Sequence, residues 1–254
     1  MFNSRDIPYT DEKKAAIIRC IQYGVGDGII EATAGYVTDN GRIGTIWDLI
    51  NKELFNKLII LDCMVGKTKR GANWKIMSVF DVKSGYICHV VREERLKSLF
   101  SSWKRGNEIY HYLRCSSYIF NNGQKPKFEQ GTIFDSNPSE FEINNITKTT
   151  DQIINDLKIN ESDVKGHFIV PFKHKGGIFK VRAIGLNEKM EIIADECWNH
   201  LINVNDSISV ELASDYSDAA NNPSRNLELT DKALRRTKRD LITDTPTEEK
   251  NNIS

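Results

Sequence analysis

The sequence predicts an α+β fold: an antiparallel sheet built from a hairpin and a three-strand meander, with helices packed on one face. Two observations predict it. Apolar segments with helical spacing occur along the chain together with short runs rich in Ile, Val and aromatic residues. The loops inside each group of strand-like runs are short, and short loops join antiparallel strands because parallel pairs need a long crossover.

The first quarter of the chain predicts two helices. Residues 11–23 open with acidic residues and place apolar side chains at helical spacing after Thr10, which suits an N-cap. The glycines of GVGDG, residues 24–28, are expected to end this helix in a flexible connector, because the segment lacks the Gly-Lys-Ser/Thr ending and the preceding strand of a phosphate loop. Residues 45–61 carry an amphipathic stripe that predicts the second helix.

A hairpin and a mixed helical and β region follow. Residues 66–73, GKTKRGAN, are expected to form a basic loop, and the runs 74–80 and 86–92 are the strands of the hairpin, with KSG between them. The later elements are expected in this order: helices at 93–104 and 107–120, a surface connection at 121–138, a helix at 149–158, strands at 167–171, 178–186 and 190–194, and a closing helix at 194–203. The two β units are expected to join in one sheet.

The folded part is predicted to be a single domain, residues 1–210, with a division into two sub-domains near 121–148 as the alternative. Residues 211–254 have little aliphatic content and many Ser, Asn, Asp and Thr residues. Such a segment cannot bury enough apolar surface to offset the entropy of ordering, so a flexible charged tail is expected. Arg235 and Arg236 begin its RRTKR cluster, either as part of a solvated tail or as a docking or phosphate-contacting segment.

Composition limits the function classes. The 254 residues carry 35 Lys and Arg against 35 Asp and Glu, so no net charge draws the protein to nucleic acid or to an anionic membrane, and such binding needs a local patch. The five cysteines are scattered without a CxxC pair, which favours reduced thiols and a cytoplasmic protein. No secretory signal or membrane-spanning run is visible, so no membrane partner is expected.

Asp81-Val82-Lys83 has two interpretations. With Asp62 it matches the acid and acid-x-lysine pattern of a metal-dependent nuclease, in which Asp62 and Asp81 bind Mg²⁺ and Lys83 steadies developing charge. However, Ser84-Gly85 and a second strand follow at once, which places the tripeptide at a hairpin tip where Asp81 accepts backbone N–H groups and Gly85 supplies a positive φ. The turn is the favoured interpretation.

Other chemistry finds less support. Cys88-His89 and the pair His111 and Cys115 offer zinc-ligand types, but neighbours on a strand face opposite ways and no tight Cys knuckle is present. Buried cysteines and hydrogen-bonded histidines are therefore expected. Cys197 and His200 are expected to pack on the closing helix rather than act as nucleophile and base.

Basic residues give a candidate binding surface. Lys67, Lys69 and Arg70 precede Trp74 in the chain, and an exposed aromatic ring beside cations suits nucleic acid, with bases stacked on the ring. Lys173 and Lys175 in the KHKGG turn add to this surface if the two hairpins are adjacent. The alternative is a soluble loop whose lysines protect strand edges.

Three strings resemble an uncharacterised family from low-GC Gram-positive bacteria and their mobile elements, a domain of unknown function. They are KRGANWKIMSVFDVKSGYICHVVREERLKSL, HYLRC and IIADECWNHLI, and the resemblance covers about residues 10–203. It implies a cytoplasmic bacterial or phage protein and brings no catalytic residue.

Together these observations predict a non-enzymatic cytoplasmic interaction protein. It is expected to be an accessory or regulatory factor of a mobile element or phage-related system that engages a protein or nucleic-acid partner without a cofactor. The alternative is the Mg²⁺-dependent nuclease. The sequence leaves the partner and the oligomeric state open.

Overall fold

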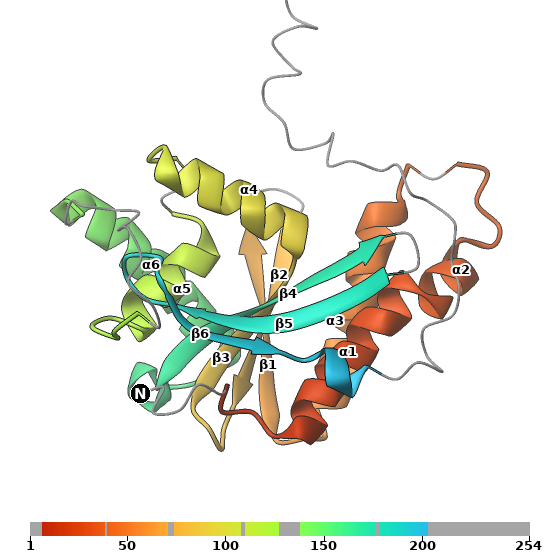
Figure 1. Ribbon diagram of the computed structural model, residues 1–254, viewed down its shortest axis with the longest axis horizontal. Coiled ribbons are helices and arrows are strands. Elements are labelled where there is room, and N and C mark those ends of the chain that lie inside the picture. The colour runs from red at the N-terminus through yellow and green to blue at the C-terminus, as the bar shows by residue number, and fades with distance from the viewer. Residues whose placement is uncertain are drawn as a thin grey trace, which may run out of the picture. The chain divides into compact units, whose positions relative to one another are not determined.

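A mixed sheet of six strands runs through the described part of the fold (Figure 1). The computed structural model describes residues 7–38, 40–70, 74–107, 110–126, 138–175 and 178–202. The strands are β1 (Cys63–Arg70), β2 (Trp74–Asp81), β3 (Tyr86–Arg92), β4 (Gly166–Lys175), β5 (Ile178–Leu186) and β6 (Ile192–Cys197). The helices are α1 (Asp11–Val25), α2 (Asp27–Thr33), α3 (Arg42–Ile59), α4 (Glu93–Lys104), α5 (Tyr112–Phe120) and α6 (Glu140–Leu157).

The α+β prediction is confirmed, but the sheet is not wholly antiparallel. Its strands lie in chain order, and each neighbouring pair is antiparallel except β3 and β4, which run parallel. The reason is the connection between them. The segment with α4, α5 and α6 returns the chain to the end of the sheet where β3 begins, so β4 runs in the same direction as β3. Parallel pairing requires such a long crossover. The short loops do join antiparallel strands, as expected.

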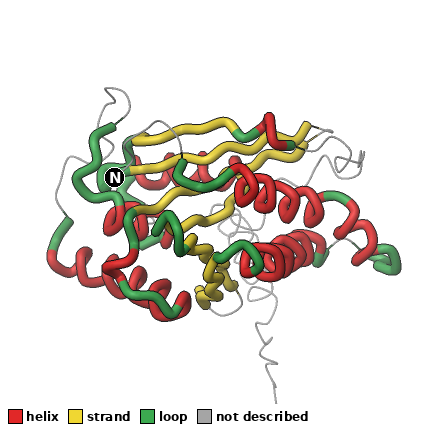
Figure 2. The backbone as a smooth tube through the Cα atoms, turned by 90° about the horizontal axis from the view of Figure 1, so that it is seen from below, coloured by secondary structure: helices red, strands yellow, loops and turns green. Residues whose placement is uncertain are grey.

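Helices cover both faces of the sheet, so the prediction of helices on one face is wrong. One core cluster joins α1 and α3 to alternate side chains of the strands, including Val79, Cys88 and Phe168. On the other face α4 and α5 pack over Ile169 and Ile184, and α6 packs over other strand residues. Figure 2 shows helices to either side of the twisted strands. Both faces of the sheet are buried, so successive residues of the central strands are apolar whichever face they point to.

Several local assignments differ from the prediction. The strand β1 includes residues 66–70 of the predicted loop, α5 begins at Tyr112 rather than at 107, and α6 begins at Glu140 rather than at 149. The last predicted strand, 190–194, corresponds to β6 but continues to Cys197, and the closing helix predicted from 194 is reduced to the single 3₁₀ turn Asn199–Leu201. Gly24 lies inside α1 rather than breaking it. A side chain on Gly24 would overlap Ile50 of α3, so the glycine allows the two helices to approach closely.

The described elements belong to one unit, Met1–Glu211. The predicted tail at 211–254 lies outside the described residues, as do residues 127–137 of the predicted surface connection. None of the described helices is both long and apolar enough to cross a membrane.

Candidate nucleic-acid interface

Asp81 ends β2 and holds the turn into β3. Its carboxylate accepts hydrogen bonds from the backbone N–H of Lys83 at 3.1 Å and of Ser84 at 3.3 Å. Gly85 closes the turn with φ of +78° and donates its N–H to the Asp81 carbonyl at 2.8 Å. The tripeptide therefore lies in a hairpin turn, as the favoured interpretation predicts.

Asp81 has one further partner, which sequence reasoning missed. The Nζ of Lys13 on α1 lies 2.5 Å from its Oδ1, and both side chains are buried. Burial alone would raise the pKa of Asp81, but the hydrogen bonds from Lys13, Ser84 and Lys83 outweigh it and lower that pKa below its usual value. The carboxylate is charged and accepts hydrogen bonds from three donors, Lys13, Lys83 and Ser84.

The other residues of the nuclease pattern do not converge on that carboxylate. Asp62 precedes Cys63, the strand partner of Asp81, but its side chain is exposed, whereas that of Asp81 is buried beneath α1. The Lys83 side chain is exposed at the turn. Within the described ranges no group of three His, Cys, Asp or Glu side chains is arranged to hold a metal ion. The Mg²⁺ site at Asp62 and Asp81 stays a prediction.

The predicted basic residues of the first hairpin lie on β1 and β2. Lys67 and Lys69 are exposed on β1, and Lys69 lies directly opposite Lys75 of β2. Arg70 is partly buried and donates from a guanidinium nitrogen to the Tyr110 carbonyl at 3.0 Å. Arg70 therefore ties this hairpin to the segment before α5, and the lysines are left to face solvent.

A second hairpin, β4 and β5, repeats the arrangement. Lys173 lies directly opposite Lys180, and Lys175 is exposed near the tip. Because β3 and β4 are parallel, the loop between β4 and β5 lies at the same end of the sheet as the loop between β1 and β2. We call this the basic end. The two hairpins share this end but are not adjacent in the sheet, because β3 lies between them, and the shared surface stays a prediction.

The two hairpin segments at the basic end carry one sign of charge, whereas Glu93 and Glu94 begin α4 directly after β3 at the same end of the sheet. Residues 66–75 contain four Lys and Arg residues and residues 173–180 contain three, with no Asp or Glu in either segment. Across the described ranges no carboxylate forms an ion pair with Lys67, Lys69, Lys75, Lys173, Lys175 or Lys180. A chain with no net charge thus contains two hairpin segments whose charged residues are all basic.

Aromatic rings connect the two hairpins. The ring of Trp47, on α3, lies edge-on to Trp74 of β2 at 6.3 Å and to Phe172 of β4 at 5.9 Å, both between centroids. Trp74 is 47% exposed although it contacts Trp47. The contact holds the indole in place and leaves about half of the residue open to solvent. Arg235 and Arg236 lie outside the described residues.

Comparison with known proteins places the chain in a family. A model described as a family of unknown function, DUF5986, matches residues 6–244. The chain belongs to DUF5986. The resemblance to an uncharacterised family is thereby confirmed, and the match extends beyond the residues on which it was based. No curated protein and no solved structure matches the chain.

This DUF5986 protein also contains a buried series of hydrogen-bonded polar side chains, which sequence reasoning missed. Ser78 Oγ lies 2.8 Å from His89 Nε2, His89 Nδ1 lies 2.9 Å from His167 Nε2, and His167 Nδ1 lies 3.0 Å from Ser117 Oγ. All four residues are buried. Two neutral imidazoles satisfy these contacts in either of two proton orders, each ring donating once and accepting once.

Burial keeps these rings neutral. It lowers the pKa of His89 to about 3. Burial and the neighbouring His89 lower the pKa of His167 well below its ordinary value. Cys88 is buried on the opposite face of β3, in the cluster with α1 and α3, so the expectation of a buried cysteine beside a hydrogen-bonded histidine is confirmed. The hydrogen bonds from Ser78 through the two histidines to Ser117 join β2, β3, β4 and α5. All four side chains are closed off from solvent, which indicates a structural role.

Proposed function

We propose that this DUF5986 chain is a non-enzymatic protein that binds single-stranded nucleic acid at the basic end. One observation carries the proposal: in each hairpin two lysines lie directly opposite each other on neighbouring strands. These are Lys69 with Lys75 and Lys173 with Lys180. Like charges placed directly opposite each other on neighbouring strands are destabilising. Both hairpins accept this cost without a neutralising carboxylate in the described part of the chain.

A phosphate backbone removes that cost. Phosphates near the two hairpins would neutralise the lysines and release counterions, which supplies most of the affinity of sequence-independent binding. Both hairpins also end at one end of a helix-covered sheet, and loops on a rigid scaffold are common binding elements. The proposed binding requires no cofactor.

Trp74 favours a single strand over a duplex. Bases in a single strand are free to stack on aromatic side chains, at about 1–3 kcal/mol per base. The half-exposed ring of Trp74 offers such a surface, and its contact with Trp47 fixes the ring before a ligand arrives. A pre-positioned ring loses less conformational entropy on binding.

We also infer a cellular setting for this protein. We propose a cytoplasmic accessory or regulatory factor of a bacterial mobile element or phage-related system, which also engages a protein partner. Five free cysteines, four of them buried, support a reducing compartment.

Fluorescence anisotropy with a labelled 20-nucleotide single strand tests the proposal. Each phosphate contact contributes a factor of about five at 0.1 M salt, so Lys69→Ser with Lys75→Ser is expected to weaken binding about 25-fold. The matched control is Lys83→Ser with Lys189→Ser, two exposed lysines in the turns at the opposite end of the sheet. Equal losses in the two double variants, or no binding by the unaltered protein, would refute the proposal.

The same assay with 5 to 10 mM Mg²⁺, a range on the order of that usual for nucleases, tests the alternative activity. The proposal expects the strand to remain intact. Cleavage that disappears in a folded Asp81→Ala variant would instead assign a nuclease that uses Asp62, Asp81 and Lys83.

A further inference from the structure

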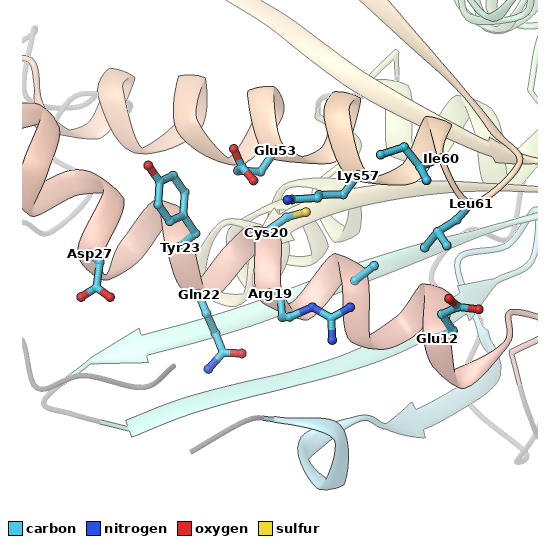
Figure 3. Close-up of a pocket in the computed structure, with 11 residues that line it drawn as sticks. Glu12, Arg19, Cys20, Gln22, Tyr23, Asp27, Glu53, Lys57, Ile60 and Leu61 are labelled. Carbon is cyan, nitrogen blue, oxygen red and sulfur yellow. The ribbon is translucent and has the colours of Figure 1, made fainter. Parts of the chain in front are cut away.

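A groove lies between α1 and α3 on the side of these helices that faces away from the sheet (Figure 3). Its volume is about 580 Å³. Ala16 and Cys20 of α1 form part of its floor, and Ile60 and Leu61 line it where α3 ends. None of these residues belongs to the basic end, so the groove is a separate feature of the molecule.

Large apolar side chains are exposed in this groove and on the helix next to it. Ile60 is 78% exposed and Tyr23 is 37% exposed, and Ile30 of the adjoining helix α2 is 43% exposed. Tyr23 rises from α1 toward α3 in Figure 3. Apolar side chains gathered in a concave, polar-rimmed surface are typical of a protein-binding site, whereas scattered ones are ordinary.

Acidic and basic residues occupy different stretches of the rim. Asp27 and Glu53 line the end near α2. Burial raises the pKa of Tyr23 there, and the carboxylates of Glu31, Glu53 and Asp27 raise it further. Arg19 and Lys57 lie in the middle, on either side of the Cys20 thiol, and Glu12 lines the opposite end beside Leu61 (Figure 3). In the described part of the chain none of these six charged residues forms an ion pair.

We propose that this groove binds an amphipathic α-helix of a protein partner, which packs as a third helix onto α1 and α3. Helix-in-groove recognition uses an apolar stripe seated between two helices. Charge complementarity sets the orientation. Acidic residues favour the N-terminal half of a helix and basic residues the C-terminal half, so the partner's N-terminal half lies over Arg19 and Lys57 and its C-terminal half over Asp27 and Glu53. The partially positive N-terminus of the partner helix then lies beside Glu12.

The orientation makes the proposal testable with two synthetic helical peptides of the same composition. Both carry a leucine stripe; one has Glu in its first two turns and Lys in its last two, and the other has the reverse order. Calorimetric titration of the full chain is expected to favour the first peptide about tenfold, since each exposed pair contributes a factor of about 1.5 to 5. A charge-swapped protein, Arg19→Glu, Lys57→Glu, Asp27→Lys and Glu53→Lys, is expected to reverse that preference, which removes any effect of peptide helicity.

Two single variants locate the binding. Ile60→Asp is expected to abolish it, while Phe55→Asp, an exposed apolar residue of α3 that does not line the groove, leaves it unchanged. Far-ultraviolet circular dichroism checks that each variant folds. Binding of neither peptide, a preference that does not reverse, or equal loss in the two variants would overturn the proposal. Nucleic-acid binding by the Ile60→Asp variant is expected to be unchanged, so this test and that of the basic end fail independently.

Discussion

Lowering the pH from 7.5 to 5 is expected to destabilise the fold through its buried histidines. His89 and His167 are fully enclosed and share a hydrogen bond with each other. Burial lowers the pKa of His89 to about 3, and that of His167 lies well below its ordinary value for the same reason and because of His89. His111, which caps α5, has its pKa lowered to about 3 by burial, with further contributions from Arg95 and Arg70.

The sign and size follow from proton linkage. Unfolding frees these rings to bind protons near the ordinary histidine pKa of about 6.5, while the folded state binds none until far lower pH. Their stabilising contribution is therefore complete above about pH 6.5 and is lost as the pH falls toward the folded-state values. At pH 5 each ring costs about 2 kcal/mol relative to pH 7.5, so the three together cost about 6 kcal/mol, a large part of a typical unfolding free energy of about 5–15 kcal/mol.

Urea unfolding at half-unit pH steps measures this loss. Between pH 6 and 5 the unfolding free energy is expected to fall by about 3 to 4 kcal/mol per pH unit, which corresponds to the uptake of nearly three protons. Carboxylates contribute little there because their unfolded pKa values lie near 4. Proton NMR titration supplies the site-specific check: the C2 protons of His89 and His167 should not shift above pH 5. A change below 1 kcal/mol, or titration of either ring near pH 6.5, would refute the reasoning.

Three substitutions test other contacts by urea or thermal unfolding. Asp81→Ala leaves the buried ammonium of Lys13 without its carboxylate and is expected to cost about 3–5 kcal/mol, of which Lys13→Met in the same chain should restore more than half; no recovery would contradict a structural ion pair. Gly24→Ala places a methyl group against Ile50 and is expected to cost about 1–3 kcal/mol, whereas a neutral result would show that α1 and α3 adapt. Asn121→Ala removes the side-chain amide that accepts a hydrogen bond from the His167 backbone N–H and donates to the carbonyls of His167 and Leu186. The substitution should lower the unfolding free energy by about 3 kcal/mol, and a loss under about 0.5 kcal/mol would contradict this role of the buried amide.

Elements with strong local patterns could be predicted from the sequence. The stripe at 45–61 matches α3, and the runs around KSG match β2 and β3 with Asp81 and Gly85 in the turn. These predictions succeed because hydrophobic periodicity and turn chemistry act over a few residues. The sequence signal for the start of α6 was also present: Ser139 and Glu142 form a capping box, the Ser-x-x-Glu pattern of a helix N-terminus.

The failures come from interactions between distant residues. β1 alternates buried Gly66 and Thr68 with exposed lysines, and its lysines and glycine resemble a loop until its pairing with β2 is known. The parallel pairing of β3 and β4 depends on a crossover of about 70 residues, which no local pattern reveals. The same pairing brings His89 beside His167 and places both basic hairpins at one end. The most informative features of the candidate site thus depend on the one strand pairing that local patterns could not give.

The salt dependence of oligonucleotide binding tests the central claim most directly. The affinity of the unaltered protein for a 20-nucleotide single strand is measured from 50 to 300 mM salt, and again after Lys69, Lys75, Lys173 and Lys180 are all changed to Ser. Each lost phosphate contact reduces the slope of log K against log salt by about 0.7, so the account predicts a slope smaller in magnitude by about 2 to 3 in the fourfold variant. An unchanged slope would show that the opposed lysines do not contact the phosphates and would contradict the assignment of the basic end.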